Sequence, residues 1–128
     1  MTLSLVLLFL MFQPPLGVES LVLEADLRDG RQVRGTIDGS SLKFSGVTVT
    51  GETVEVHISK PPEWSNVTWV CLIDWDAARR IYVVRNFSWT GELRQIWEQL
   101  IVADESGEPV TLNGNEIQTA RFGYFHGN

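Results

Sequence analysis

The sequence has few of the residues that build cross-linked or metal-binding sites. Its 128 residues include one cysteine and two histidines, His57 and His126. A single cysteine excludes a disulfide within the chain, and neither histidine has a second histidine at a metal-ligand spacing. The G-x-S-x-G motif of many hydrolases is also missing. We therefore expect no metal or other cofactor, and a fold that depends on packing alone.

Positive charge is also scarce. Ten lysines and arginines stand against 16 aspartates and glutamates, which gives a net charge of -6 and an isoelectric point near 4.8. Binding to a phosphate backbone or an anionic membrane requires clustered lysine and arginine, and the sequence has no such cluster. Nucleic acid is therefore not an expected partner of this acidic protein.

The longest apolar run lies at the N-terminus and is too short to span a bilayer. Ten of the residues in Met1–Phe12 are apolar and none is charged. Such a run has the length of a signal-peptide core, and Val18 and Ser20 are small residues at the positions that a signal peptidase reads. We expect residues 1–20 to be a signal peptide, cleaved to start the mature chain at Leu21. A buried N-terminal strand or helix is the alternative.

Cleavage of this leader would place the protein outside the cytoplasm, as a secreted, periplasmic or cell-envelope protein. No stable membrane span would remain after cleavage. Residues 21–128 are enough for one domain and too few for two ordinary ones.

Alternation of apolar and polar residues dominates the mature chain. Leu21, Leu23, Ala25 and Leu27 alternate with acidic residues, and similar patterns recur to residue 59. Turn signals at Asp29-Gly30, Asp38-Gly39 and Asn113-Gly114 predict hairpins between strands. The denser apolar runs around 66–76 and 81–85 predict the middle of the sheet. The pattern favours an antiparallel β-sandwich or a partly open barrel of about eight strands.

One segment has the spacing of a helix instead. Within Gly91–Ala103 the apolar residues recur at intervals of three and four, and Thr90 could cap the N-terminus. These apolar residues are Leu93, Ile96, Trp97, Leu100 and Ile101. We expect one short helix packed against an edge of the sheet.

Five tryptophans are many for a domain of this size. Trp69 and Trp97 lie on apolar stripes and are expected in the core. Trp64, Trp75 and Trp89 lie beside breaks or turns, where an exposed ring could stack on a sugar or anchor a protein. The predicted ligand-binding platform consists of these three tryptophans with Tyr82 and Tyr124.

The candidates for catalysis are fewer. Asp74 and Asp76 flank Trp75, and in a strand both carboxylates would face one side, near enough to share a divalent cation. A small secreted hydrolase or metal-dependent enzyme would use these aspartates with His57. A polar strand end entering a turn explains the same pair.

Two further features concern modification. Asn66 and Asn86 each begin an N-x-S/T sequon, which makes them candidate glycosylation sites, and the alternative is that these short tripeptides arise by chance. Cys71 lies in the apolar stretch 67–73, where a thiol is expected to be buried, with a raised pKa and little reactivity.

Together these features predict an exported, non-catalytic binding or envelope-associated module that recognises a carbohydrate or a protein through aromatic residues. The small enzyme described above is one alternative. A structural subunit that assembles by pairing of edge strands is another.

Overall fold

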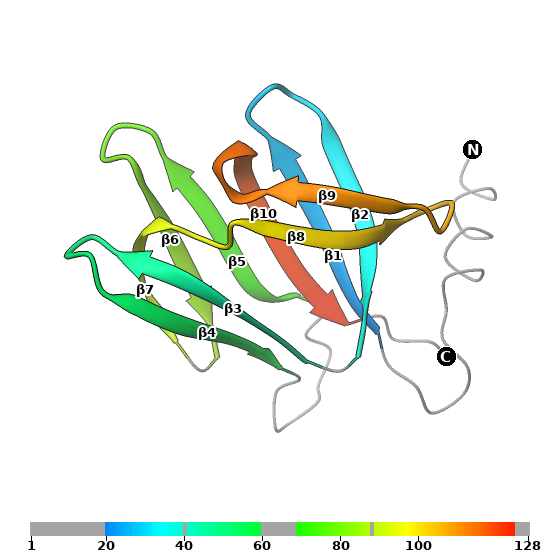
Figure 1. Ribbon diagram of the computed structural model, residues 1–128, viewed down its shortest axis with the longest axis horizontal. Coiled ribbons are helices and arrows are strands. Elements are labelled where there is room, and N and C mark those ends of the chain that lie inside the picture. The colour runs from blue at the N-terminus through cyan, green and yellow to red at the C-terminus, as the bar shows by residue number, and fades with distance from the viewer. Residues whose placement is uncertain (1–19, 40, 60–68, 88, 125–128) are drawn as a thin grey trace.

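The computed structural model describes residues 20–39, 41–59, 69–87 and 89–124, and these form a mainly β structure (Figure 1). The antiparallel β prediction is confirmed. The ten strands are β1 (Ser20–Leu27), β2 (Gln32–Asp38), β3 (Ser41–Thr48), β4 (Thr53–Ser59), β5 (Trp69–Asp76), β6 (Ile81–Asn86), β7 (Thr90–Gln95), β8 (Gln99–Asp104), β9 (Pro109–Asn113) and β10 (Ile117–Tyr124).

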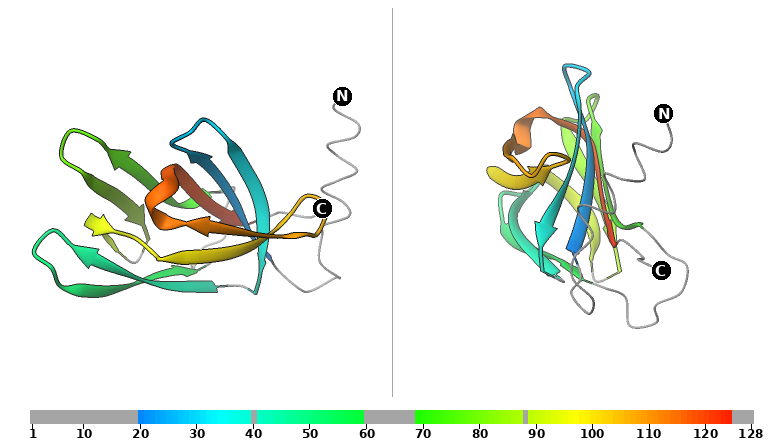
Figure 2. Two further views of the ribbon diagram at one scale, coloured as in Figure 1. Left: turned by 45° about the horizontal axis from the view of Figure 1, so that its top comes forward. Right: turned by 90° about the vertical axis from the view of Figure 1, so that its right-hand side faces the viewer.

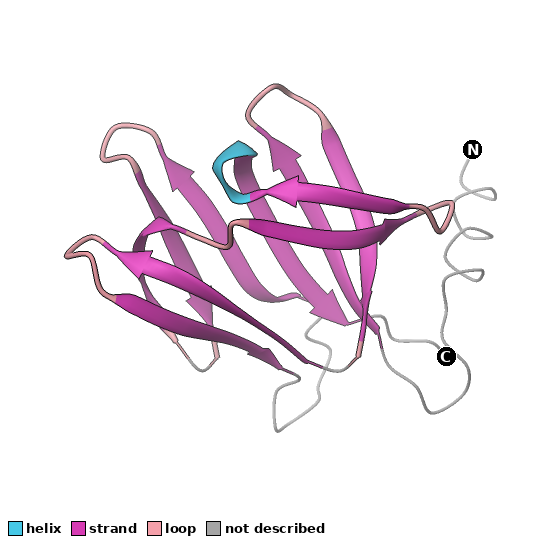
Figure 3. Ribbon diagram, viewed as in Figure 1, coloured by secondary structure: helices cyan, strands magenta, loops and turns pink. Residues whose placement is uncertain are grey.

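All ten strands belong to one open sheet, in the order β4-β3-β7-β6-β5-β10-β1-β2-β8-β9. Every pairing is antiparallel, and β10 lies between β1 and β5. The β5–β6 hairpin lies near the middle of this order, as its dense apolar pattern predicts. In the described residues the only helical element is the 3-10 turn Gly114–Glu116 (Figure 3).

The two end hairpins, β3–β4 and β8–β9, fold over the same face of the sheet (Figures 1 and 2). Each of these hairpins is joined to the rest of the sheet by a ladder of only two residue pairs. The β2–β8 ladder has two residue pairs, Gly35 with Asp104 and Thr36 with Ala103. A Cβ atom at Gly35 would lie 2.5 Å from the Ala103 carbonyl oxygen. Glycine therefore permits the close approach of β8 at this corner.

The core fills the space between the folded hairpins and the sheet that they cover. Trp97 meets Phe44 of β3 and Phe122 of β10 edge-on, with ring centroids 5.1 and 5.9 Å away. Edge-to-face contacts of this kind stabilise aromatic clusters beyond the area that they bury. Trp97 thus joins the two walls of the core, and its predicted burial is confirmed.

The helix predicted within Gly91–Ala103 is wrong. Residues 90–95 form β7 and residues 99–104 form β8. Strand β7 pairs with β6 and β3, whereas β8 pairs with β9 and β2. Ile101, which the helical stripe would bury, is 63% exposed. Pairing with distant strands has overridden a periodicity that arises by coincidence at the junction of two strands.

Two predicted hairpins are also wrong, although the chain turns at both sites. Gly39 has the positive φ that a tight turn uses, but β2 and β3 belong to different parts of the sheet. After Asn113, the chain forms a 3-10 turn and β10 leaves to pair with β1 and β5. The turn at Asp29-Gly30 is confirmed, since β1 and β2 pair directly.

Candidate functional site

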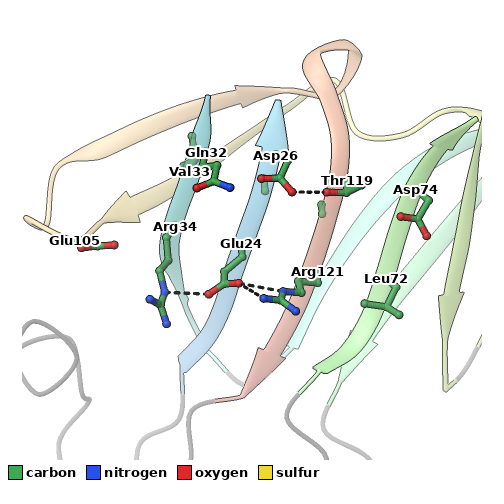
Figure 4. Close-up of a pocket in the computed structure, with 12 residues that line it drawn as sticks. Glu24, Asp26, Gln32, Val33, Arg34, Leu72, Asp74, Glu105, Thr119 and Arg121 are labelled. Carbon is green, nitrogen blue, oxygen red and sulfur yellow. Dashed lines mark hydrogen bonds and ion pairs between the residues drawn. The ribbon is translucent and has the colours of Figure 1, made fainter. Parts of the chain in front are cut away.

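The outer face of the sheet, on the side away from the folded hairpins, is polar (Figure 4). A shallow depression of about 700 Å³ lies on it. Glu24 of β1 forms one ion pair with Arg34 of β2, at 3.2 Å, and another with Arg121 of β10. The Arg121 guanidinium also lies 4.1 Å from the centre of the Trp69 ring. Both arginines of this depression are therefore already paired with a carboxylate.

A second and larger hollow, of about 950 Å³, lies at the end of the sheet where the turns of several strands meet. We call it the arginine hollow. Its lining residues are Arg28, Trp75, Arg80, Tyr82, Arg94, Gln95, Ile96, Trp97, Glu98, Gln99, Asn113, Gly114, Asn115 and Glu116. They come from the β1–β2 turn, β5, the β5–β6 turn, β6, β7, the β7–β8 connection, the first residue of β8, the last residue of β9 and the 3-10 turn.

Arg28 is held in place at the wall of this hollow by three groups. Its guanidinium carbon lies 3.9 Å from the centre of the Trp75 ring, a cation–π contact. Its Nη2 donates a hydrogen bond of 2.7 Å to the Tyr82 hydroxyl, and its Nε donates a longer one of 3.4 Å to the Ile117 carbonyl. None of these partners is a carboxylate, so the charge of Arg28 is oriented but not neutralised by them.

Tyr82 anchors this arrangement to the chain beneath it. Its hydroxyl donates to the Gly114 carbonyl oxygen at 2.7 Å, and its ring centroid lies 4.6 Å from that of Trp75. Burial raises the pKa of the Tyr82 hydroxyl, although the nearby Arg28 acts in the opposite direction. Tyr82 therefore stays protonated and works as a hydrogen-bond donor.

The other charges of the hollow are unevenly compensated. Within the described ranges, neither Arg80 nor Arg94 forms an ion pair or a side-chain hydrogen bond, and both are exposed. Glu116 accepts from Asn113 at 2.6 Å and lies 3.4 Å from Arg31, so it is already engaged. Glu98 is the other carboxylate of the lining. The hollow thus concentrates available positive charge in a protein whose net charge is negative.

The structure brings together only part of the predicted aromatic platform. Trp75 is half-buried and touches Tyr82, which is 2% exposed. Trp89 lies beyond the opposite end of β6 from Tyr82 and is half-buried, and Tyr124 at the end of β10 is 2% exposed. Trp64 lies outside the described residues.

Sequence reasoning missed Arg28, Arg80 and Arg94 as site residues. They lie far apart in the chain, in three different turns and strands, and each looks like an ordinary surface arginine. Only the folded topology brings them to one hollow. No local pattern in the sequence could have indicated this.

The three residues of the predicted catalytic cluster each contact a different partner. Asp74 lies 3.6 Å from Arg85, Asp76 pairs with Arg79 at 2.8 Å, and the His57 ring contacts Glu55 at 3.1 Å. Hydrogen bonds from Arg79 hold the pKa of Asp76 below its usual value. In the part of the chain that the structure describes, no three histidine, cysteine or acidic side chains are grouped to hold a metal ion. His126 lies outside that part.

The remaining predicted sites have clear positions. Cys71 is fully buried in β5, as predicted, and burial raises its pKa to about 12. The amide nitrogen of Asn86 donates to the His57 carbonyl oxygen at 2.7 Å, and its oxygen accepts from the Trp89 backbone nitrogen at 2.5 Å. Asn66 lies outside the described residues.

Comparisons with known proteins assign no family. No protein-family model matches the chain, and neither curated proteins nor solved structures gave a significant match. Residues 20–39, 41–59, 69–87 and 89–124 contain no helix long and apolar enough to cross a membrane.

Proposed function

We propose that this protein is an exported, non-catalytic binding module whose ligand occupies the arginine hollow. Residues 1–20 act as a cleaved signal peptide, so that the working protein is secreted, periplasmic or attached to the cell envelope. The folded ten-stranded sheet serves as a partly open barrel that holds the hollow at one end. The ligand is a carbohydrate or a protein segment.

The observation that carries this proposal is the fixed position of Arg28. Ring stacking on Trp75 and a hydrogen bond to Tyr82 hold its guanidinium at the wall of the hollow before any ligand arrives. A side chain that is already ordered loses little conformational entropy on binding. An oriented arginine without a carboxylate partner in a hollow of this size is typical of a recognition site.

The enzyme alternative has less support. It requires His57 and an aspartate in one cleft, but His57 lies on the edge strand β4 with Glu55, and Asp76 supports the β5–β6 turn. The subunit that pairs by edge strands also has less support. Strand β9 begins with Pro109, which has no amide donor, and the Asn86 side chain occupies the His57 carbonyl on β4.

The test is a binding screen with protein purified from expression of the full-length chain in an exporting host. Mass spectrometry of the secreted material should give a mature N-terminus at Leu21. The purified protein is then applied to immobilised oligosaccharides and peptides, and hits are measured by calorimetry.

Arg28→Gln should weaken a genuine hit at least about tenfold, because a charge-assisted hydrogen bond is lost. Arg85→Gln, on the outer face, is the matched control and should bind like the wild type. Retention of Met1, or hits that both variants bind equally well, would count against the proposal.

A further inference from the structure

We infer that the arginine hollow binds an acidic saccharide, a sugar that carries a carboxylate or a sulfate group. This inference rests on the proposed binding function and names its ligand class. It starts from the charges of the lining, which differ from those of the rest of the molecule.

Three of the ten basic residues of the chain line this one hollow. Arg28 has hydrogen-bond partners without negative charge, and Arg80 and Arg94 have no side-chain partner in the described residues. On the outer face, by contrast, Arg34 and Arg121 share the carboxylate of Glu24. Guanidinium groups that lack a carboxylate are the natural partners of an anionic ligand group.

The remaining open surface of the hollow is suited to hydroxyl groups. Four neutral amide side chains line it, Gln95, Gln99, Asn113 and Asn115. Gln99 already donates to Asn113 at 3.3 Å, and Asn113 donates to Glu116 at 2.6 Å. Gln95 and Asn115 are exposed and form no side-chain hydrogen bond in the described residues. Each of these two amides offers both a donor and an acceptor, which matches the mixed character of a sugar hydroxyl. A ring that carries hydroxyls and one acidic group would therefore find complementary partners beside the arginines.

An acidic peptide is the competing occupant, and the lining fits it less well. Peptide recognition usually relies on an apolar anchor that enters an accessible apolar pocket. The apolar residues Ile96, Trp97 and Tyr82 are 6%, 4% and 2% exposed, so their surface is already used inside the protein. One face of the Trp75 ring is covered by Arg28. The accessible lining consists mainly of arginine, amide and carboxylate groups.

The experiment compares matched polymers by calorimetry at low salt. Polygalacturonate is paired with its methyl ester, dextran sulfate with dextran, and poly-glutamate serves as the acidic peptide. We expect at least one acidic polysaccharide to bind about tenfold or more tightly than its neutral partner, and more tightly than poly-glutamate. The two pairs distinguish a carboxylate from a sulfate. Added salt should weaken this binding, because screening reduces the attraction between charges.

Two variants test where the acidic group binds. Arg80→Gln and Arg94→Gln leave the contacts of Arg28 intact, and each should weaken acidic polysaccharide binding about tenfold. Arg85→Gln removes the same charge from the outer face and should leave the affinity unchanged. A loss in all three variants would mean attraction to overall charge and would overturn the inference.

The outcomes separate this inference from the proposed function. Equal binding of acidic and neutral polymers, or a preference for poly-glutamate, overturns the acidic-saccharide inference. In that case the proposed binding function still stands if Arg28→Gln weakens the affinity for the ligand found in the screen. If no saccharide binds, the acidic-saccharide inference is overturned. If no peptide binds either, the proposed binding function is overturned as well.

Discussion

Gly114 and Trp97 approach so closely that a side chain cannot stand between them. A Cβ atom at position 114 would lie 1.9 Å from the Trp97 carbonyl oxygen. The Gly114 amide donates to the Glu98 carbonyl at 3.1 Å, and the Trp97 indole nitrogen donates to the Leu112 carbonyl at 3.2 Å. The β7–β8 connection and the end of β9 are thereby joined beneath the arginine hollow.

Gly114→Ala should therefore destabilise the protein strongly. The added methyl group meets backbone rather than a flexible side chain, so the chain itself must move. We expect a loss of roughly 3 kcal/mol in the free energy of unfolding, at the upper end for overpacked sites. Urea denaturation followed by tryptophan fluorescence measures it. Asn115→Ala, in the same 3-10 turn with an exposed side chain, is the control and should change little.

The same region shows what the sequence could and could not predict. The alternation in β1 correctly predicted which residues face the core, because burial on one side of a strand follows directly from a period of two. Asn113-Gly114 correctly predicted a turn, but the expected pairing of the two strands that flank it is wrong. A turn signal is local, whereas the choice of β10 to pair with β1 and β5 depends on residues far away in the chain.

The candidate site was predictable only in its aromatic part. The sequence predicts an exposed Trp75 because it lies beside a turn, and it offers Tyr82 only as a further aromatic of the platform. The structure pairs the two residues across the β5–β6 hairpin, with their rings in contact. Arg28 reaches them from the turn that follows β1, and β1 is separated from β5 by β10 in the sheet. The contact therefore depends on strand order, and strand order was the part of the fold that local patterns did not contain.

Asn86 should stabilise the fold through its amide nitrogen, which links the end of β6 to the edge strand β4. Asn86→Asp keeps the oxygen that accepts from Trp89 but removes the donor to the His57 carbonyl. We expect a loss of about 1–2 kcal/mol in unfolding free energy and faster amide exchange across β4. Denaturation and hydrogen-exchange mass spectrometry measure the two effects.

A glycan on Asn86 would offer a different explanation for such a loss. Ser88→Ala distinguishes the two, because it removes the sequon and leaves the Asn86 amide in place. If the amide contact is responsible, Ser88→Ala keeps wild-type stability. Equal destabilisation by both variants would contradict the structural role.

Asp104 should make the β8–β9 hairpin sensitive to acid. Its Oδ1 accepts from the Ser106 hydroxyl at 2.7 Å and from the backbone amides of Ser106 and Glu108, each at 2.9 Å. These hydrogen bonds, chiefly that from the Ser106 side chain, hold the pKa of Asp104 below its ordinary value of 3.8. A lowered pKa in the folded state means that the carboxylate stabilises the fold above that value and loses its effect as pH falls through the folded pKa.

The melting temperature should therefore fall as the pH is lowered below about 4, and less steeply in Asp104→Asn, which keeps the acceptor oxygen but does not titrate. Differential scanning fluorimetry between pH 7 and pH 2 measures both profiles. Asp38→Asn, whose carboxylate accepts no hydrogen bond in the described residues, should follow the wild-type profile. Identical slopes for Asp104→Asn and the wild type would contradict the role of Asp104.

Cys71 should be unreactive in the folded protein. Its side chain is fully buried in β5, and burial raises the pKa of the thiol to about 12. At pH 8 only about one thiol in ten thousand would then be ionised, and the thiolate is the reactive form. Titration with an aromatic disulfide reagent should detect no thiol in native protein and one in denaturant.

Ser45→Cys adds a thiol at an exposed position of β3, so this variant should show one reactive thiol when native and two when unfolded. Rapid native labelling of the wild type would mean that β5 opens to solvent, which would contradict its place between β10 and β6 in the sheet.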